Sequence, residues 1–357
     1  MKSFNIGNFE IKLPIIQGGM GVGISLSGLA SAVANEGGVG VISCAGLGLL
    51  YKNISGTYNE KCIYGLREEI RKARKKTSGI IGVNIMVALS NYVDMVKTAI
   101  EEKIDVIFSG AGLPLDLPAY LPADSKTKLV PIVSSSRAAK IICDKWNMNY
   151  NYLPDALVVE GPKAGGHLGF KKEQIEDSHY SLEQLITEIV PIATSFSDQK
   201  EIPVIAAGGI TTGSDISHFM ELGASGVQMG SIFVTTNECD ASEVFKEVYI
   251  NSSASDMLII ESPVGMPGRA IAGEFIQNVQ KGMEKPKSCP FHCIKTCDYT
   301  KSPYCIIKAL YNAAKGNMKK GYAFAGTNAY LSEKISSVKE VVEALKAEFL
   351  IASHKVF

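Results

Sequence analysis

The chain has 357 residues, and its 36 lysines and arginines balance 36 aspartates and glutamates. With 20% charged and 46% hydrophobic residues it has the composition of a globular protein, and the neutral balance gives no reason to expect nucleic acid or an anionic membrane surface as a partner. No run of about 18 apolar residues occurs and the start lacks the layout of a secretory signal, so we expect a cytoplasmic protein with reduced thiols and no membrane span.

Short apolar, β-branched segments recur through the first two thirds of the chain, and none of them alternates polar with apolar residues. Strands that are buried on both faces have this composition, which is typical of parallel sheets. The eight predicted strands are PIIQ (14–17), VGVIS (39–43), IGVNI (81–85), DVIFS (105–109), LVPIV (129–133), DALVVE (155–160), PVIAAG (203–208) and GVQMGS (226–231).

Helical patterns separate most of these strands. The predicted helices cover residues 25–38, 64–76, 91–103, 136–146, 181–193 and 213–223. The segment 110–128 is rich in proline and gives no clear helix, and residues 46–60 are expected to form a loop. Eight buried strands in this alternation predict a (β/α)8 TIM barrel, with a doubly wound open sheet as the structural alternative.

The barrel pattern accounts for residues 1–284, and residues 285–357 form a predicted C-terminal helical, cysteine-bearing extension that packs on the barrel as a cap. It contains two predicted helices, 305–317 and 336–349, the second with a capping box from Ser337 to Glu340. Between them, GYAFAGTNAYL (321–331) is rich in glycine and aromatic residues, and we expect it to reach over the mouth of the active site.

Four cysteines are clustered at the start of this extension: Cys289, Cys293, Cys297 and Cys305. The C-x3-C-x3-C spacing would align three thiols along one face of a helix, if the segment is helical. Zinc and iron–sulfur sites remain alternatives, but the spacing matches a zinc ribbon poorly. We predict reduced structural thiols and no metal site.

In barrels, active sites lie at the carboxyl ends of the strands. Five predicted strands end in segments that could bind a ligand, and four of these segments are rich in glycine, which permits positive φ and lets backbone N–H groups approach a ligand. They are QGGMGVG (17–23), Asn84, EGPKAGGHLGF (160–170), AGGITTGSD (207–215) and QMGS (228–231).

The loops after the seventh and eighth strands predict a phosphate site, because barrels often bind phosphate there. AGGITTGSD also opens a helix whose N-terminal amides can bind an anion, with Thr212 or Ser214 as the cap. The phosphate is expected at Gly208, Gly209, Gly230 and Ser231.

The motifs QGGM (17–20), GVNI (82–85), EGPKAGGH (160–167), IPVIAAGGI (202–210) and LGASGVQMGS (222–231) resemble the nitronate monooxygenase family, formerly called 2-nitropropane dioxygenases. FMN-dependent enoyl-acyl-carrier-protein reductases belong to the same wider family. The resemblance covers about residues 10–275 and implies an FMN-dependent oxidoreductase. Its expected activity is the oxidation of alkyl nitronates with O2, and the alternative is an NAD(P)H-dependent reductase of an enoyl thioester or quinone.

The resemblance also implies which residues bind FMN, with Glu160 standing where many relatives have glutamine. The expected cofactor-binding residues are Gly18, Gly19, Met20, Asn84, Glu160, Gly165, Gly166, Gly208, Gly209, Gln228, Met229, Gly230 and Ser231. His167 matches the histidine that faces the flavin and the substrate in nitronate monooxygenases.

Chemistry gives His167 two candidate catalytic tasks. An imidazole that titrates near neutral pH could remove the α-proton of a nitroalkane, or it could donate a hydrogen bond to a nitronate that is already formed. The other four histidines lack a comparable glycine-rich context and are expected to be structural or exposed.

Three features leave alternatives open. Leu168 and Phe170 replace residues that are typical of the monooxygenases and the reductases respectively, so neither subgroup is matched cleanly. Arg269, expected in a turn, could bind an anionic group or pack against a helix C-terminus. The phosphate motifs also resemble those of IMP dehydrogenase, but the loop after the sixth strand has no cysteine nucleophile. A non-enzymatic phosphate-binding barrel and a homodimer remain open.

Overall fold

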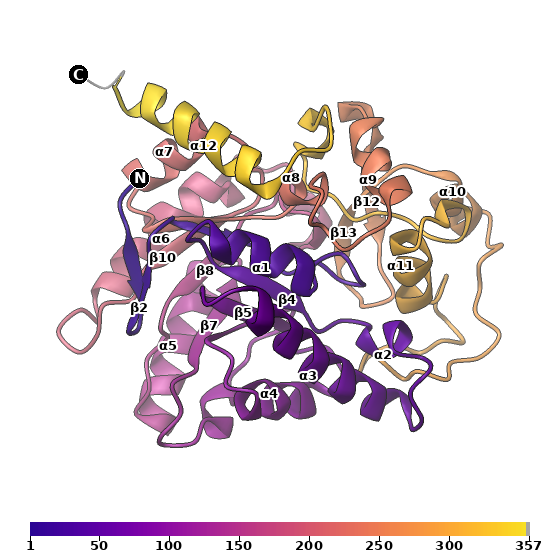
Figure 1. Cartoon of the computed structure of the whole chain (residues 1–357), viewed down its shortest axis with the longest axis horizontal. Helices are drawn as coiled ribbons and strands as arrows, with labels where there is room; N and C mark the ends of the chain where they lie inside the picture. The colour runs from indigo at the N-terminus through magenta and orange to yellow at the C-terminus, as the bar shows by residue number, and fades with distance from the viewer. Residues whose placement is uncertain (355–357) are drawn as a thin grey trace.

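Eight parallel strands form a closed barrel with helices around it (Figure 1) in the computed structural model, which describes residues 1–354. The strand order is β3 (Ile15–Gln17), β11 (Gly226–Met229), β10 (Val204–Ala207), β8 (Leu157–Glu160), β7 (Lys128–Val133), β6 (Val106–Gly110), β5 (Ile81–Met86) and β4 (Gly40–Ser43). A parallel bridge between Ile16 and Val39 joins the two ends of this order. The predicted (β/α)8 barrel is therefore confirmed, and the open sheet was the wrong alternative.

Two hydrophobic cores explain why the strand residues do not alternate in polarity. Side chains inside the barrel, such as Val106, Phe108 and Val158, form one core. The opposite faces of the strands pack against the surrounding helices in a second core. A hairpin of β1 (Phe4–Ile6) and β2 (Phe9–Ile11) adds Ile6 and Ile11 to the inner core.

All six helices predicted between the barrel strands are present. They are α1 (Ser27–Asn35), α3 (Tyr58–Lys76), α4 (Tyr92–Glu101), α5 (Ser136–Tyr150), α6 (Leu182–Thr194) and α7 (Gly213–Glu221). The loop expected at 46–60 contains a short α2 (Leu47–Leu50), and α3 begins earlier than predicted because Thr57 and Glu60 form a capping box. The segment 110–128 contains one 3-10 turn, Leu117–Tyr120.

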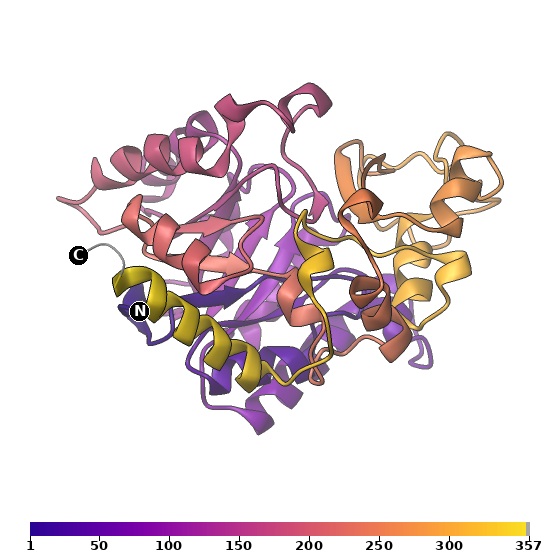
Figure 2. The same ribbon diagram turned by 90° about the horizontal axis from the view of Figure 1, so that it is seen from above.

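The last helix of the chain lies on the barrel. After β11 there is only a four-residue α8 (Ser231–Val234), whereas α12 (Val338–Ser353) packs against α7 and α1 (Figures 1 and 2). The Glu348 carboxylate of α12 accepts a hydrogen bond of 2.7 Å from the backbone N–H of Gly213, at the start of α7.

The chain between α8 and α12 forms a group of elements at one side of the molecule, which Figure 2 shows at the right. These elements are α9 (Glu243–Ile250), β12 (Met257–Glu261), β13 (Pro267–Ile271), α10 (Glu274–Gln280) and α11 (Ile306–Ala314). β12 and β13 form a small antiparallel sheet with β9 (Gly166–His167), a two-residue strand in the loop after β8.

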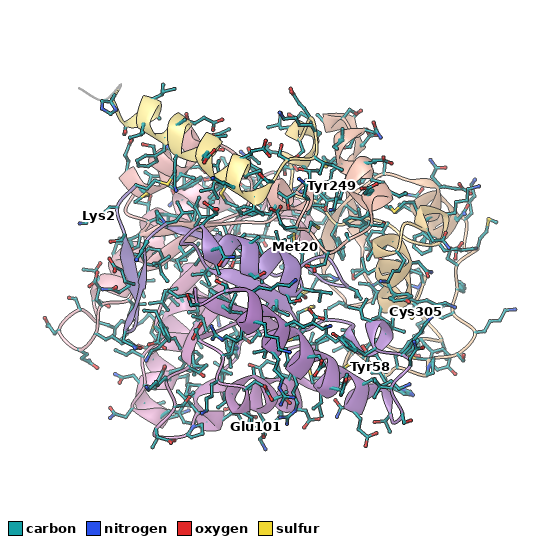
Figure 3. All side chains as sticks on the ribbon, viewed as in Figure 1. Lys2, Met20, Tyr58, Glu101, Tyr249 and Cys305 are labelled. Carbon is teal, nitrogen blue, oxygen red and sulfur yellow. The ribbon has the colours of Figure 1, made fainter. Side chains whose placement is uncertain are left out.

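The cysteine-bearing segment is not helical, so its thiols do not share a helical face. Residues 281–305 form turns and irregular structure, and Pro286 and Pro290 lack the backbone N–H that a helix interior requires. All eight cysteines are free thiols, and the described residues contain no group of three or more His, Cys, Asp or Glu side chains arranged to hold a metal ion. Figure 3 shows Cys305 on the side of the molecule where Tyr58 of α3 lies.

Across the 354 residues that the structure describes, no helix is long and apolar enough to cross a membrane.

Candidate active site

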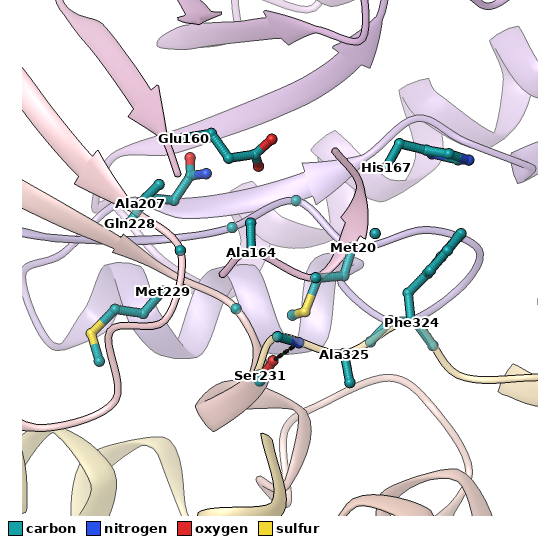
Figure 4. A pocket seen from close by; sticks show the side chains of 18 of the residues that line it. Met20, Glu160, Ala164, His167, Ala207, Gln228, Met229, Ser231, Phe324 and Ala325 are labelled. Atoms are coloured by element: carbon teal, nitrogen blue, oxygen red, sulfur yellow. Dashed lines mark hydrogen bonds between the residues drawn. The ribbon is translucent and has the colours of Figure 1, made fainter. Parts of the chain in front are cut away.

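A cavity of about 250 Å3 lies at the carboxyl ends of the barrel strands. Its walls contain every residue that the sequence analysis proposed for cofactor binding or catalysis: Gly18, Gly19, Met20, Asn84, Glu160, Gly165, Gly166, His167, Gly208, Gly209, Gln228, Met229, Gly230 and Ser231. Figure 4 shows Glu160 and Gln228 at one end of the labelled side chains and His167 with Phe324 at the other. Residues from five separate strand ends therefore meet around one space.

Glycine is required at particular points of this wall. Gly208 and Gly209 have φ values of 104° and 82°, a left-handed backbone that side chains disfavour. A Cβ on Gly165 would lie 2.6 Å from the carbonyl carbon of Ala325 and from the backbone nitrogen of Gly326. Glycine at these positions keeps the main chain exposed to the cavity and allows a second segment to approach it.

The helix end that was expected to bind an anion already carries two carboxylates. The backbone N–H groups of Thr211 and Thr212 donate to Asp215, each at 2.9 Å, and that of Gly213 donates to Glu348. Thr212 is the cap, as one of the two predicted residues. The first turn of α7 is thus not a free anion site, and the phosphate prediction now rests on the loop backbone at Gly208, Gly209, Gly230 and Ser231.

His167 is held between the barrel loop and the elements that follow the barrel. β9 pairs with β13 so that His167 is in register with Gly268. Its Nε2 lies 2.7 Å from the hydroxyl of Ser262, and its ring meets the Phe324 ring edge-on, with 5.0 Å between the centroids. Burial lowers the pKa of His167 to about 4, so the imidazole is neutral at pH 7.

Glu160 places a carboxyl group in the same cavity. The strand registers align Glu160 with Ala207 and Ala207 with Gln228, which brings the Glu160 and Gln228 side chains to the same level of the barrel. Burial raises the pKa of Glu160 to about 7. Within residues 1–354, no side chain is hydrogen-bonded to this carboxyl group or forms an ion pair with it.

Arg269 has neither of its two expected roles. It lies in β13 rather than in a turn, its side chain is buried, and Nη2 donates a hydrogen bond of 2.8 Å to the carbonyl oxygen of Pro162. It does not line the cavity. The guanidinium instead supports the loop after β8, which carries Gly165 and His167.

A segment of the extension, residues 321–329, forms the opposite side of the cavity, and we call it the strap. Gly326 N–H donates to Ser231 Oγ at 2.9 Å, as drawn in Figure 4, and Asn328 Nδ2 donates to the carbonyl oxygen of Gly209 at 2.7 Å. Phe324, Ala325, Gly326, Asn328 and Ala329 all line the cavity. The prediction that GYAFAGTNAYL reaches the site is confirmed.

Sequence reasoning missed several other residues around the cavity. Ser262 follows β12 and contacts His167, and Phe245 and Tyr249 of α9 and Leu310 of α11 line the wall near the strap. These residues are far from the barrel strands in sequence and carry no motif. Phe245, Tyr249 and Ser262 precede the predicted extension and Leu310 is aliphatic, so no sequence signal indicated them.

The chain is similar to known proteins over most of its length. A family model described as nitronate monooxygenase matches residues 2–348. A protein named probable nitronate monooxygenase from Staphylococcus aureus is 29% identical over 308 residues, which cover 76% of this chain and 79% of the relative.

Two solved structures are similar over nearly the whole chain. FabK from Thermotoga maritima has a TM-score of 0.73 and 28% identity, and the match covers 97% of this chain and 95% of that one. A nitroalkane oxidase from Streptomyces ansochromogenes also has a TM-score of 0.73, with 21% identity and coverage of 97% and 98%, and supports the fold.

Proposed function

Because the chain belongs to the nitronate monooxygenase family, we propose that this oxidoreductase is FMN-dependent and oxidises alkyl nitronates with O2. The observation that carries the proposal is the convergence of His167 with the glycine-rich ends of β3, β10 and β11 around one cavity. A nucleotide-like cofactor needs close main-chain donors for its phosphate, and the substrate needs a polar group beside the reacting atoms.

The cavity residues fit FMN. Gly208, Gly209 and Gly230 present main chain without side chains, and a Cβ on Gly230 would meet only Met20, at 3.5 Å or more. Backbone N–H groups bind phosphate without needing a lysine or arginine. Gly18, Gly19, Met20 and Asn84 would line the flavin, and Glu160, Gly165, Gly166, Gln228, Met229 and Ser231 would complete the cofactor site. Bound FMN would accept electrons from the substrate and pass them to O2.

His167 would act as a neutral hydrogen-bond donor. With a pKa of about 4 it is a weak base, poorly matched to removing the α-proton of a nitroalkane at neutral pH. An imidazole with one N–H can still donate to a nitronate oxygen while its other nitrogen stays with Ser262. Of the two tasks considered for His167, we therefore propose the second, with a nitronate that is already formed as the substrate.

The second candidate is an NAD(P)H-dependent FMN reductase acting on an enoyl thioester or a quinone. The similarity to FabK over 97% of the chain keeps this candidate open, because it includes the extension as well as the barrel.

An anaerobic experiment tests the proposal. The purified protein, loaded with FMN, is mixed with propyl-1-nitronate or with NADPH, and flavin absorbance is followed. Bleaching by the nitronate supports the proposal. Bleaching by NADPH alone overturns it in favour of the reductase, and a protein that takes up no FMN overturns both.

A further inference from the structure

The charges around the cavity are unusual for a site that would bind an anionic substrate. The side chains in its walls that can ionise are Glu160, His167 and Tyr249, and among the described residues no lysine or arginine lines it. His167 is neutral at pH 7. Burial raises the pKa of Tyr249 far above neutral pH, and its hydroxyl donates to the carbonyl oxygen of Phe324. Glu160 is thus the side chain that determines the net charge of the cavity wall near neutral pH.

Three cations that are close to cavity residues in sequence or in strand pairing lie outside the cavity wall. Arg269 donates to the Pro162 carbonyl, outside the cavity wall. Lys246, in α9 between Phe245 and Tyr249, directs Nζ to the carbonyl oxygen of Asn237, at 3.3 Å. Lys163 is exposed, and its side-chain carbons lie against Gly209, at the proposed phosphate position. Among the described residues, none of these three cations lines the cavity.

The part of the wall that is not assigned to FMN suits an alkyl chain. Ile24, Met86 and Ile132 line the cavity and belong to this part. A carboxylate brought against these side chains would lose water without gaining a cation, and it would face the Glu160 carboxylate above pH 7. The phosphate of FMN, on the proposed function, would add more negative charge.

We infer that the cavity selects nitro substrates that are uncharged outside the reacting group, and that Glu160 is the residue that rejects a second anionic group. The inference rests on the proposed function for the identity of the reacting group. It predicts that simple alkyl nitronates bind more tightly than carboxylated ones such as propionate-3-nitronate. The single nitronate charge is accommodated by the His167 hydrogen bond, whereas a distal carboxylate has no donor to meet it.

Isothermal titration calorimetry tests this with two ligands of the same size. At pH 7.5 the FMN-loaded protein is titrated with 3-nitropropanamide and with 3-nitropropionate. We expect the amide to bind at least about tenfold more tightly. Equal or tighter binding of the carboxylate, or binding of neither ligand, would overturn the inference.

Variants test the part assigned to Glu160. Glu160→Gln should reduce the amide-to-carboxylate ratio several-fold, whereas Glu201→Gln, at an exposed residue before β10, should leave it unchanged. An unchanged ratio in Glu160→Gln contradicts the role of Glu160. Failure of the proposed function can be distinguished from failure of this inference. If only the proposed function failed, the flavin would stay oxidised with every nitronate, while the protein would still bind the amide more tightly than the carboxylate.

Discussion

The two sides of the cavity are built in different ways. The barrel side consists of loops that directly follow β3, β8, β10 and β11, and it presents mainly glycine backbone. The strap side comes from residues about 100 positions further along the chain. Its hydrogen bonds to the barrel loops reach Ser231, Gly209 and Lys163, and backbone hydrogen bonds join Ala323 and Ala325 to β13. The barrel side is fixed by the barrel sheet, whereas the strap side depends on its contacts with the barrel loops and with β13.

The two sides therefore have different tasks: one carries the reactive side chains and the other closes the cavity. The groups that can take part in chemistry, Glu160 and His167, lie on the barrel side. The strap supplies Phe324 against the His167 ring and closes the cavity. We therefore expect changes on the barrel side to alter turnover and ionisation, and changes at the strap to alter stability and cofactor affinity.

The largest expected effect is at His167. His167→Ala should lower kcat/KM for propyl-1-nitronate about 100-fold or more, because it removes the polar group beside the reacting atoms. FMN binding, measured by fluorescence quenching, should be nearly unchanged. His179→Ala, at an exposed histidine, is the control. A similar loss of FMN in the His167 variant would show that this residue is part of the cofactor support instead.

The second effect concerns Glu160 and pH. Its pKa of about 7 in the folded chain exceeds the value of 4.5 for the unfolded chain, so the folded state holds this proton more tightly. Stability should therefore fall as pH rises from about 4.5 to about 7. In the protein without FMN, Glu160→Gln should be more stable than wild type at pH 8 by at most about 3 kcal/mol, and this gain should shrink towards pH 4.5. Urea unfolding at pH 5 and pH 8 measures this, and an equal gain at both pH values would contradict it.

The third effect tests the close contact between the two sides. Gly165→Ala places a Cβ 2.6 Å from the strap backbone, and we expect a loss of roughly 1–3 kcal/mol of stability together with weaker FMN binding. Gly273→Ala is a matched control, because its Cβ would have no neighbour within 4 Å and its φ is −175°. The melting temperature of Gly165→Ala should be clearly lower than that of Gly273→Ala. Equal melting temperatures would mean that the strap backbone moves away from the new Cβ without loss of stability.

The smallest expected effect is at Asn328. Asn328→Ala removes the hydrogen bond to the Gly209 carbonyl and should cost about 1 kcal/mol. If the strap stabilises the cofactor loops, the dissociation constant for FMN should rise roughly three- to tenfold. The control is Asn149→Ala, at an exposed residue of α5. An unchanged FMN affinity would show that this strap contact does not stabilise the loops that bind the cofactor.

The same contrast explains what the sequence could predict. Barrel strands have both faces buried, so each appears as a continuous apolar segment, and the residues after such strands must converge at one end. Gly18 and Glu160 were identified in this way as residues at strand ends, and the family resemblance added their expected role in FMN binding.

The contacts between the barrel and the segments that follow it could not be predicted because they join distant parts of the chain. Ser262 and Phe324 approach His167 only through tertiary packing, and no local pattern indicates this. The cysteine spacing would place three thiols on one face only if the segment were a helix, and residues 281–305, which contain three prolines, form turns and irregular structure instead. Arg269 was expected in a turn, whereas pairing with β12 and β9 makes the segment a strand.

The position of α12 has a consequence for how the chain can be rearranged. Met1 and Leu350 line the same surface hollow, and Figures 1 and 2 both show the end of α12 close to the start of the chain. Val338, Val342 and Leu345 are buried, so deleting this helix would expose apolar surface and release the strap at its far end. A circular permutant that links the start of the chain to the end of α12 and opens the chain at the exposed residues 197–199 would instead keep the strap anchored on both sides.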